Sequence, residues 1–413
     1  MIMRSERSFF GSPALKAHNV GTTRTRTPAQ TMAVLEPVLS SYGITRLANV
    51  TGLDRIGIPV YQAIRPNSRS LSVSQGKGLD STSAKVSALM ESLETYHAEN
   101  AVYVRAESYS ALSRHARVAD PTQLQLSRTS TFHVDGVLPW SDGWDLVRAE
   151  PVFVPFELVH TNATLPLVEG SGAFVPSSNG LASGNHMTEA ALHGICELIE
   201  RDAETLWRLG GERTTAETRV SPDSVECEQA CRLLEQYRRA GIGVMIWDVT
   251  SDVQVACFVV VIFDPESDPE LNPCCAASGS GCHPDRGIAL CRALTEAAQS
   301  RLTSIAGSRD DITIGSHRRF RSAQSLEYHK RLMDVHGVRD FNNVPHAVGS
   351  TLDDDLNYVL HRLAERGMDQ AIIVNLSSPE LDLAFARAVV PGLEGSIDLS
   401  TYRPRARARA RLA

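Results

Sequence analysis

Apolar residues recur along the chain with two different spacings. Long segments have them every three or four residues, as on one face of a helix, and shorter segments alternate or run continuously, as in strands. Helices are predicted at residues 31–42, 83–100, 188–208, 220–240, 285–305, 326–336 and 352–366. Strands are predicted at residues 44–50, 56–64, 71–78, 151–159, 242–249, 253–264, 370–376 and 386–390.

Three segments carry no pattern that would place them in a core. Residues 1–22 are expected to be a disordered N-terminal segment, and residues 265–283 a long loop rich in Pro, Gly, Ser and Cys. Residues 397–413 alternate Arg with Ala and are expected to form a disordered, Arg-rich tail. Contact with RNA or phosphate is the alternative for this tail.

The longest amphipathic helix, at residues 188–208, follows a turn-rich loop that begins at Ser177. Its acidic face carries Glu189, Glu197 and Glu200. Carboxylates in one stripe repel each other unless a cation lies between them. A solvated acidic face is the ordinary interpretation of this pattern, and a cation-binding face is the alternative.

The composition is that of a soluble globular protein: 42% of the 413 residues are hydrophobic and 22% are charged. The net charge of −7 argues against a nucleic-acid binder. The longest apolar run, residues 255–263, is too short to span a membrane, and no secretory signal is visible, so a cytoplasmic location is predicted. The eight cysteines are therefore expected to be free thiols.

Two groups of these cysteines stand out. Cys227 and Cys231 are one helical turn apart, like half of a zinc site, but no matching pair follows at zinc spacing. Cys274, Cys275 and Cys282 gather in the loop at residues 265–283. Small inert thiols are favoured there over a role in sulfur chemistry.

The acidic spacing of the central helix recurs on a second helix, where Glu91 and Glu94 form another E-x-x-E pair. A hard cation such as Mg²⁺ takes oxygen ligands and shares them with phosphate, and arginine can fork onto phosphate oxygens. The sequence has no Walker motif and no dinucleotide-binding fingerprint. A nucleotide site built from helices is one interpretation, and solvated surface ion pairs are the other.

Several stretches form a set of motifs in a fixed order. They are TRLANVTGLDRIGIPVYQAIRP, SVSQGKG, SALMESLETYHAE, SSNGLASGNHMTEAALHGICELIERDA, RALTEAAQSRLTSIAGSRDD and VVPGLEG. With these stretches the chain resembles the YcaO family from about residue 20 to residue 395. The resemblance implies an α/β (mixed α+β) YcaO-like fold over residues 23–396, with several sheets flanked by helices and a nucleotide site between helices.

The resemblance also implies the residues of a site for ATP and several Mg²⁺ ions. Carried over by motif, the metal ligands are Glu91, Glu94, Glu197 and Glu200. The nucleotide-binding residues are Arg24, Thr31, Lys77, Ser87, Asn185, Glu189, Arg201, Arg292 and Glu296, and Arg201 and Arg292 would also stabilise the transferred phosphoryl group. Arg24 and Thr31 are included for their seven-residue spacing, and a solvated turn is the alternative for Lys77.

The activity implied by this resemblance is activation of a peptide backbone amide by O-phosphorylation. The nucleophile then decides the product, which is an azoline, a thioamide or an amidine. The text GSGCHPDRGIALCRALTEAAQSRL with SRDD is most similar to YcaO proteins that pair with a TfuA-like partner protein. Those proteins are associated with peptide thioamidation, for which a sulfur donor is needed.

Two alternatives to thioamidation remain. Azoline-forming cyclodehydratases, which act on ribosomal precursor peptides, usually end in a Pro-x-Pro-x-Pro tail, whereas the tail of this chain has the single proline Pro404. A non-catalytic protein that binds ATP is the other alternative. Likeness to the family also makes a homodimer a reasonable expectation.

Overall fold

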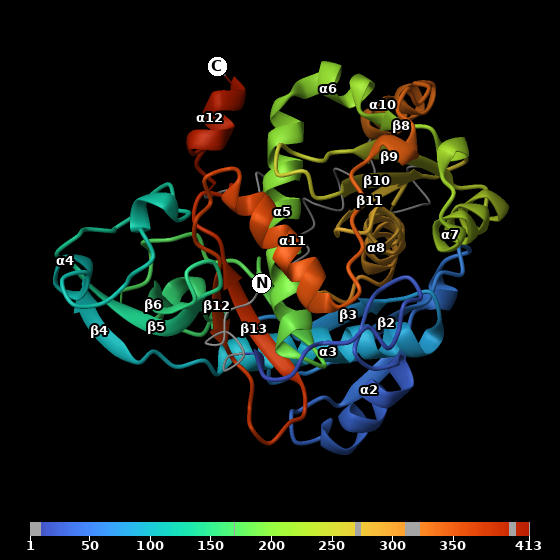
Figure 1. The fold of residues 1–413 in the computed structure, drawn as a ribbon. Coiled ribbons are helices and arrows are strands. Elements are labelled where there is room, and N and C mark those ends of the chain that lie inside the picture. Colours follow the sequence, from blue (N-terminus) through green and yellow to red (C-terminus); the bar gives the residue numbers. More distant parts are fainter. Residues whose placement is uncertain (1–9, 169, 269–273, 310–322, 396–401, 413) are drawn as a thin grey trace. The chain divides into compact units, whose positions relative to one another are not determined.

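The computed structural model describes residues 10–168, 170–268, 274–309, 323–395 and 402–412, and Figure 1 shows its helices and strands. The chain divides into two compact units. Unit 1 consists of the described residues of 1–17, 93–209 and 348–413, and unit 2 of those of 18–92 and 210–347. The single domain expected over residues 23–396 is therefore made of two units, each assembled from segments that are far apart in the sequence.

Unit 2 begins with α2 (Pro28–Leu35), which is shorter than the helix predicted at residues 31–42. Its N-cap Thr27 and Gln30 form a reciprocal capping box. The helix gives way to a 3₁₀ turn that contains Pro37. A proline inside a helix removes a backbone donor and clashes with the preceding turn, so the helix cannot continue to residue 42.

A three-stranded antiparallel sheet follows α2, as the sequence pattern predicts. Gly76 lies in its third strand, where a Cβ atom would come within 1.9 Å of the Ala88 nitrogen in the next helix. The glycine therefore allows that helix to pack directly against the strand. The elements are β1 (Arg46–Asn49), β2 (Val60–Ile64), β3 (Val73–Lys77) and α3 (Ser81–Glu99), of which α3 begins in unit 2 and ends in unit 1.

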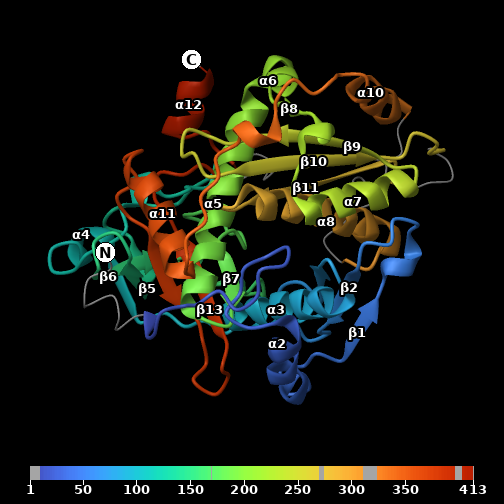
Figure 2. The ribbon, with the colours of Figure 1, turned by 45° about the vertical axis from the view of Figure 1, so that its right-hand side comes forward.

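The second sheet of unit 2 has four antiparallel strands in the order β11-β10-β9-β8. Helix α8 packs against β10 and β11 and runs beside them in both ribbon views (Figures 1 and 2). Helix α7 packs on α8, where the buried Tyr237 hydroxyl donates to the Leu294 carbonyl at 2.6 Å. The elements are β8 (Arg219–Val220), α7 (Glu228–Arg239), β9 (Gly243–Asp248), β10 (Cys257–Phe263), β11 (Ala276–Cys282) and α8 (Arg286–Ala306), with α6 (Gly211–Glu217) and α10 (Ala323–Met333) elsewhere in the unit.

Strand β11 corrects the prediction of a long loop at residues 265–283. Its sequence AASGSGC reads as a loop because glycine and serine are rare in strands. A Cβ atom at Gly279 would come within 2.3 Å of the Ala297 nitrogen in α8. The small residues are therefore required by the close approach of a helix to the strand rather than by a flexible loop.

Unit 1 is built on a six-stranded antiparallel sheet in the order β4-β5-β12-β13-β7, with β6 paired to β5. A core that includes Trp140, Phe174 and Ile372 lies against it. The strands are β4 (Arg105–Ser108), β5 (Val137–Asp145), β6 (Glu150–Pro155), β7 (Leu181–Gly184), β12 (Ile372–Asn375) and β13 (Ala384–Val389), and a short helix, α4 (Tyr109–Leu112), follows β4.

The central helix predicted at residues 188–208 is α5 (Met187–Leu209). It packs on β7 and β13 through buried residues such as Ala190, Ile195 and Ile199. On other sides it contacts α11 (Leu352–Ala364) and α12 (Ala406–Leu412). The buried side chains of α5 include Glu189, Glu200 and Asp202, so part of its acidic face lies inside the protein.

The structure differs from the expectation of a disordered C-terminal tail. Within residues 397–413, residues 402–412 are described, and α12 packs on α5. Arg407 pairs with the buried Asp202 through Nε–Oδ1 and Nη2–Oδ2 contacts of 2.8 and 2.9 Å. The Glu394 carboxylate also accepts from the Ala408 N–H at 3.0 Å. The arginines that made the tail look solvated therefore include one that anchors it.

The N-terminal expectation differs in the same way, although residues 1–9 lie outside the described part. The Ala14 N–H donates to Asp353 at 2.7 Å, and Lys16 pairs with the buried Asp355 at 2.6 Å. These contacts attach residues 14–16 to the beginning of α11. The pattern of apolar residues does not reveal these contacts, because polar groups make them.

Candidate active site

The predicted site residues lie in both units, and each group is described within its own unit. Unit 1 holds Glu94, Asn185, Glu189, Glu197, Glu200 and Arg201. Unit 2 holds Arg24, Thr31, Lys77, Ser87, Glu91, Arg292 and Glu296.

On α5, Arg201 joins the two metal-ligand candidates. Its guanidinium lies 3.5 Å from Glu197 and 3.2 Å from Glu200. Glu200 is buried, whereas about a fifth of the Glu197 side chain is exposed. Glu197 also accepts a hydrogen bond from the Gly180 N–H at 3.0 Å. The result is a pair of fixed carboxylates with a cation beside them, which is not a freely solvated acidic face.

The other unit 1 residues are arranged around the beginning of α5. The buried Glu189 accepts from the backbone N–H of Asn185 at 2.9 Å and from its side-chain amide at 3.3 Å. Glu94, near the end of α3, accepts from the Ser183 hydroxyl at 2.5 Å. Each carboxylate is thus oriented by a donor in the segment that leads into α5.

In unit 2 the structure brings Lys77 and Glu296 together, with the Lys77 ammonium 2.5 Å from the Glu296 carboxylate. Glu296 also accepts from the backbone N–H and hydroxyl of Ser280 at 3.2 and 3.3 Å. Arg292 is one turn earlier on α8, on the same face as Glu296. The Lys77 side chain is four-fifths buried in an ion pair, so the alternative of a solvated turn lysine is wrong.

Glu91 is a carboxyl whose pKa is clearly perturbed. It accepts from the Gln75 N–H at 3.4 Å, and burial raises its pKa to about 7 despite that hydrogen bond and the charge of Lys77. The negative charge of Glu296 acts in the same direction as burial. A carboxylate that is this costly to ionise is one that a bound cation stabilises.

Three other predicted residues also belong to unit 2. Ser87 is half-buried in α3, one turn before Glu91. Arg24 forms a backbone bridge with His18, and Thr31 is buried in α2, where its hydroxyl donates to the Thr27 carbonyl at 3.3 Å. The roles assigned to Arg24, Thr31 and Ser87 remain predictions.

The cysteines of the 274–282 segment lie in or beside β11 and are buried. Cys282 is paired across the ladder with Cys257 in β10. Burial raises the pKa of Cys274 to about 11, so this thiol stays protonated at neutral pH. The geometry agrees with the interpretation of small packing thiols.

Sequence reasoning missed three residues with notable environments in the structure. Gln75 orients Glu91, Asp202 anchors the C-terminal segment, and Arg387 lies buried in β13. A signal existed for the last of these, because Arg387 is a single charge inside the apolar run of residues 383–390. A charge in such a run requires a partner or a function.

The carboxylate groups fit Mg²⁺ bound together with a nucleotide. No three His, Cys, Asp or Glu side chains in the described part of the chain are placed to hold one metal ion by themselves. Mg²⁺ is usually held by one or two carboxylates and completes its shell with phosphate oxygens and water. The Glu197–Glu200 pair with its arginine matches that requirement.

Comparison with known proteins gives the family. A model described as YcaO cyclodehydratase, ATP- and Mg²⁺-binding, matches residues 75–394. The chain belongs to the YcaO family. ATP and Mg²⁺ are the ligands in that family's description, which confirms the cofactors expected from the sequence.

One YcaO relative carries information on genomic context. It is a protein of Rhizobium leguminosarum bv. trifolii named for its position in the tfuA 3′ region, and no activity is given for it. The two sequences are 37% identical over 389 residues, which cover 91% of this chain and 89% of the relative.

Two solved structures share the fold. YcaO from Methanopyrus kandleri, bound with AMPPCP and Mg²⁺, matches 95% of this chain and 98% of its own with a TM-score of 0.73 and 22% identity. A heterocyclase in complex with substrate and cofactor matches 93% of this chain with a TM-score of 0.73 and 19% identity, and this chain spans 54% of its length. The predicted YcaO-like α/β fold is thereby confirmed.

No helix in the described part of this YcaO chain is both long enough and apolar enough to cross a bilayer.

Proposed function

We propose that the protein uses ATP and Mg²⁺ to convert a backbone amide of a peptide into a thioamide, together with a TfuA-type partner protein and a sulfur donor. The Glu197–Arg201–Glu200 group on α5 supports the ATP-dependent part of this proposal. The relative from the tfuA 3′ region supports the thioamide branch.

The reaction forms a bond from sulfur to the carbonyl carbon of the amide and breaks the carbon–oxygen bond. ATP bound with Mg²⁺ would supply the phosphoryl group that makes this oxygen a leaving group. The oxygen leaves as inorganic phosphate, which takes up the proton of the attacking hydrosulfide, and ADP is the other product. The nitrogen of the amide keeps its substituents, so the peptide chain is not cut.

The chain's own residues would bind and orient the reactants. Glu94, Glu197 and Glu200 in unit 1 and Glu91 in unit 2 would each ligate Mg²⁺, because carboxylate oxygens are the protein ligands that this ion prefers. Arg201 would direct its guanidinium toward phosphate oxygens, for which its planar fork is suited. Gly180 fixes one Glu197 oxygen through its N–H, which keeps the carboxylate oriented before any ligand arrives.

The remaining candidates would serve the nucleotide. The buried Glu189 holds Asn185 in place, and Glu296 holds the Lys77 ammonium. Arg292, Ser87, Arg24 and Thr31 are assigned to the nucleotide through the family motifs. The two cations Lys77 and Arg292 would offset the negative charge of the phosphates in unit 2.

The experiment is ATP turnover measured with and without Mg²⁺, peptide and TfuA partner, followed by mass spectrometry of the peptide. Replacement of one oxygen by sulfur supports thioamide formation. Loss of water instead would assign the protein to the azoline-forming branch. ATP binding without phosphate release under all these conditions would show a non-catalytic ATP-binding protein.

A further inference from the structure

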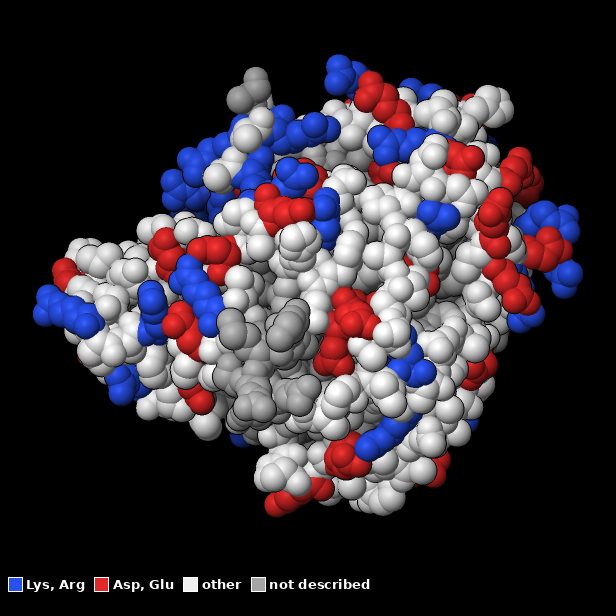
Figure 3. Space-filling view, viewed as in Figure 1, with Lys and Arg blue, Asp and Glu red and all other residues white. Residues whose placement is uncertain are grey.

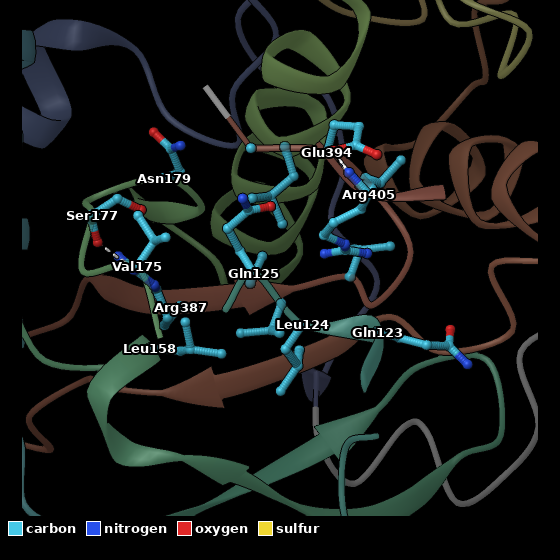
Figure 4. A pocket seen from close by; sticks show the side chains of 16 residues that line it. Gln123, Leu124, Gln125, Leu158, Val175, Ser177, Asn179, Arg387, Glu394 and Arg405 are labelled. Carbon is cyan, nitrogen blue, oxygen red and sulfur yellow. Dashed lines mark hydrogen bonds between the residues drawn. The ribbon is translucent and has the colours of Figure 1, made fainter. Parts of the chain in front are cut away.

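Unit 1 contains a small pocket that opens to solvent and lies at β13 and the loop before β7. Its lining is mostly apolar and includes Leu124, Leu158 and Leu198. Figure 4 shows Arg387 extending toward Ser177 in this pocket, which Gln125 also lines. A mainly apolar cavity with a few convergent polar groups is the usual form of a small-ligand site.

Arg387 is the unusual residue of this pocket, because it is 2% exposed and incompletely bonded. Its Nη2 donates to the Ser177 carbonyl, but Nε and Nη1 have no hydrogen-bond partner in the described part of the protein. Burial lowers the pKa of Arg387 to about 10, which still leaves it charged at neutral pH. A buried cation with unused donors is costly unless an anion completes its hydrogen bonds.

The same pocket offers an unused acceptor. The side-chain amide nitrogen of Gln125 donates to the Arg403 carbonyl at 3.3 Å, whereas its buried Oε1 has no partner in the described residues. A ligand that satisfied both residues would carry an anionic acceptor for Arg387 and an N–H donor for Gln125. A peptide carboxylate next to an amide N–H has both groups, and an apolar side chain would suit the leucines of the lining.

The pocket is also joined to the α5 carboxylates within unit 1. Leu198, which lines the pocket, directly follows Glu197. The loop that carries Ser177 also carries Gly180, whose N–H holds Glu197. The charge of Glu197 acts on Arg387, so the two groups lie close enough to influence each other.

We propose that this pocket binds a carboxylate of the peptide substrate, with Arg387 donating to the carboxylate and Gln125 accepting from a peptide N–H. The inference rests on the proposed function in that the substrate is taken to be a peptide. A free phosphate ion would satisfy Arg387, but it would leave Gln125 Oε1 and the apolar lining without partners.

The test is a methyl NMR titration of the full chain without ATP or Mg²⁺, in which the methyl groups of Leu124, Leu158 and Leu198 report on the pocket. The probes are acetylglycylleucine, its C-terminal carboxamide and inorganic phosphate. The acid should shift these methyl signals and bind about tenfold or more tightly than the carboxamide, since a hydrogen bond to a charged group is lost in the amide. Equal affinities for acid and amide, or phosphate binding as tight as that of the acid, would overturn the proposal.

A second pair of probes identifies the source of the carboxylate. Acetylaspartate amide and acetylasparagine amide differ only in their side-chain charge. Preference for the aspartate compound would indicate recognition of an acidic side chain, and preference confined to acetylglycylleucine would indicate recognition of a C-terminus. Either preference supports the proposal, and the absence of both contradicts it.

The variant Arg387→Gln should lose the preference for acid over amide, and Arg409→Gln, which removes an exposed charge from α12, should retain it. Retention of the preference in Arg387→Gln would remove this residue from the site. If Arg387→Gln fails to fold, the probes with the native protein still decide. The titration contains no ATP, so a negative titration would contradict the pocket proposal and leave the proposed function intact. Likewise, a failure of ATP turnover would not by itself produce a negative titration.

Discussion

Two buried arginines in different regions show how a charge can be used inside this protein. In unit 2, Arg301 contacts Asp54 at 2.8 Å, the Cys274 carbonyl at 2.6 Å and Asp264 at 3.5 Å. In unit 1, Arg387 is equally buried and donates to the Ser177 carbonyl, but its Nε and Nη1 have no hydrogen-bond partner among the residues that the structure describes. The first environment is complete without a ligand, and the second is incomplete.

The difference indicates which arginine stabilises the fold and which is held ready for a ligand. A buried cation surrounded by carboxylates and carbonyls is part of the structure, since its removal strands those groups. A buried cation with spare donors keeps a site open at a cost in stability. Figure 3 shows Lys and Arg side chains gathered on the surface around α12. These surface charges belong to neither class.

The largest expected effect is that of Arg301→Gln. It would leave the buried Asp54 without the cation that contacts it at 2.8 Å and would remove one of the two cations of Asp264, and should reduce the free energy of unfolding by about 3–5 kcal/mol. Urea denaturation followed by circular dichroism measures this change. Arg55→Gln is the matched control: Arg55 contacts the same Asp264 at 2.9 Å but is half exposed, so about 1 kcal/mol or less is expected. Equal losses in the two variants would contradict the distinction.

A somewhat smaller and more local effect is expected for Arg407→Gln. The change strands the buried Asp202 but affects a helix at the end of the chain. We therefore expect α12 to detach while the rest of unit 1 stays folded. Limited proteolysis should cut the variant near the C-terminus before the native protein, and an unchanged cleavage pattern would show that the ion pair does not anchor the segment.

Arg387→Gln should change the free energy of unfolding by no more than about 1 kcal/mol, because it loses one hydrogen bond and removes a poorly compensated charge. The same urea experiment measures this change. A loss as large as that of Arg301→Gln would mean that Arg387 is a structural residue after all.

The smallest expected effect is on the pH dependence of cysteine alkylation. A thiol whose thiolate form accepts hydrogen bonds can be compared with one whose pKa is raised by burial. A hydrogen bond from the Cys291 thiol, aided by backbone N–H groups of α7, lowers the pKa of Cys227 to about 6, whereas burial raises the pKa of Cys231. Below pH 6 the Cys227 sulfur is a neutral thiol and above it a thiolate. Its alkylation by iodoacetamide should therefore rise through about pH 6 and level off by pH 8.

Mass spectrometry of the alkylated peptides separates the two sites. Cys231 is the more exposed thiol and is the control, and its alkylation should still be rising above pH 8. Parallel pH profiles for Cys227 and Cys231 would contradict the assigned hydrogen bond.

The sequence was sufficient for the long amphipathic helices, because α3, α5 and α8 follow the spacing of their apolar residues. It failed at β11, where Gly279 is needed because α8 packs directly against the strand. Nothing in the local sequence pattern reveals that helix. It failed again at the C-terminus, because Arg407 reads as a solvated charge until the buried Asp202 is known.

The candidate site shows the same limit. Spacing placed Glu197, Glu200 and Arg201 on one helix, and in the structure Arg201 contacts both carboxylates. The donors that orient the carboxylates, Gly180 for Glu197 and Ser183 for Glu94, come from a different element and are found only in three dimensions. Arg387 is recognised only when two observations are combined: it is a lone charge in an apolar strand, and two of its nitrogens have no partner among the described residues.

The α5 carboxylates are central to the proposed function, and Mg²⁺-dependent ATP turnover of Glu197→Gln tests their role most directly. Glutamine can still accept from the Gly180 N–H, so the variant should fold, but it cannot supply an anionic ligand to Mg²⁺. Glu365→Gln, a change of the same kind in an ion pair at the end of α11, is the control. We predict that turnover falls to background in Glu197→Gln and stays near the native rate in Glu365→Gln. Near-native turnover in Glu197→Gln would contradict the proposed site.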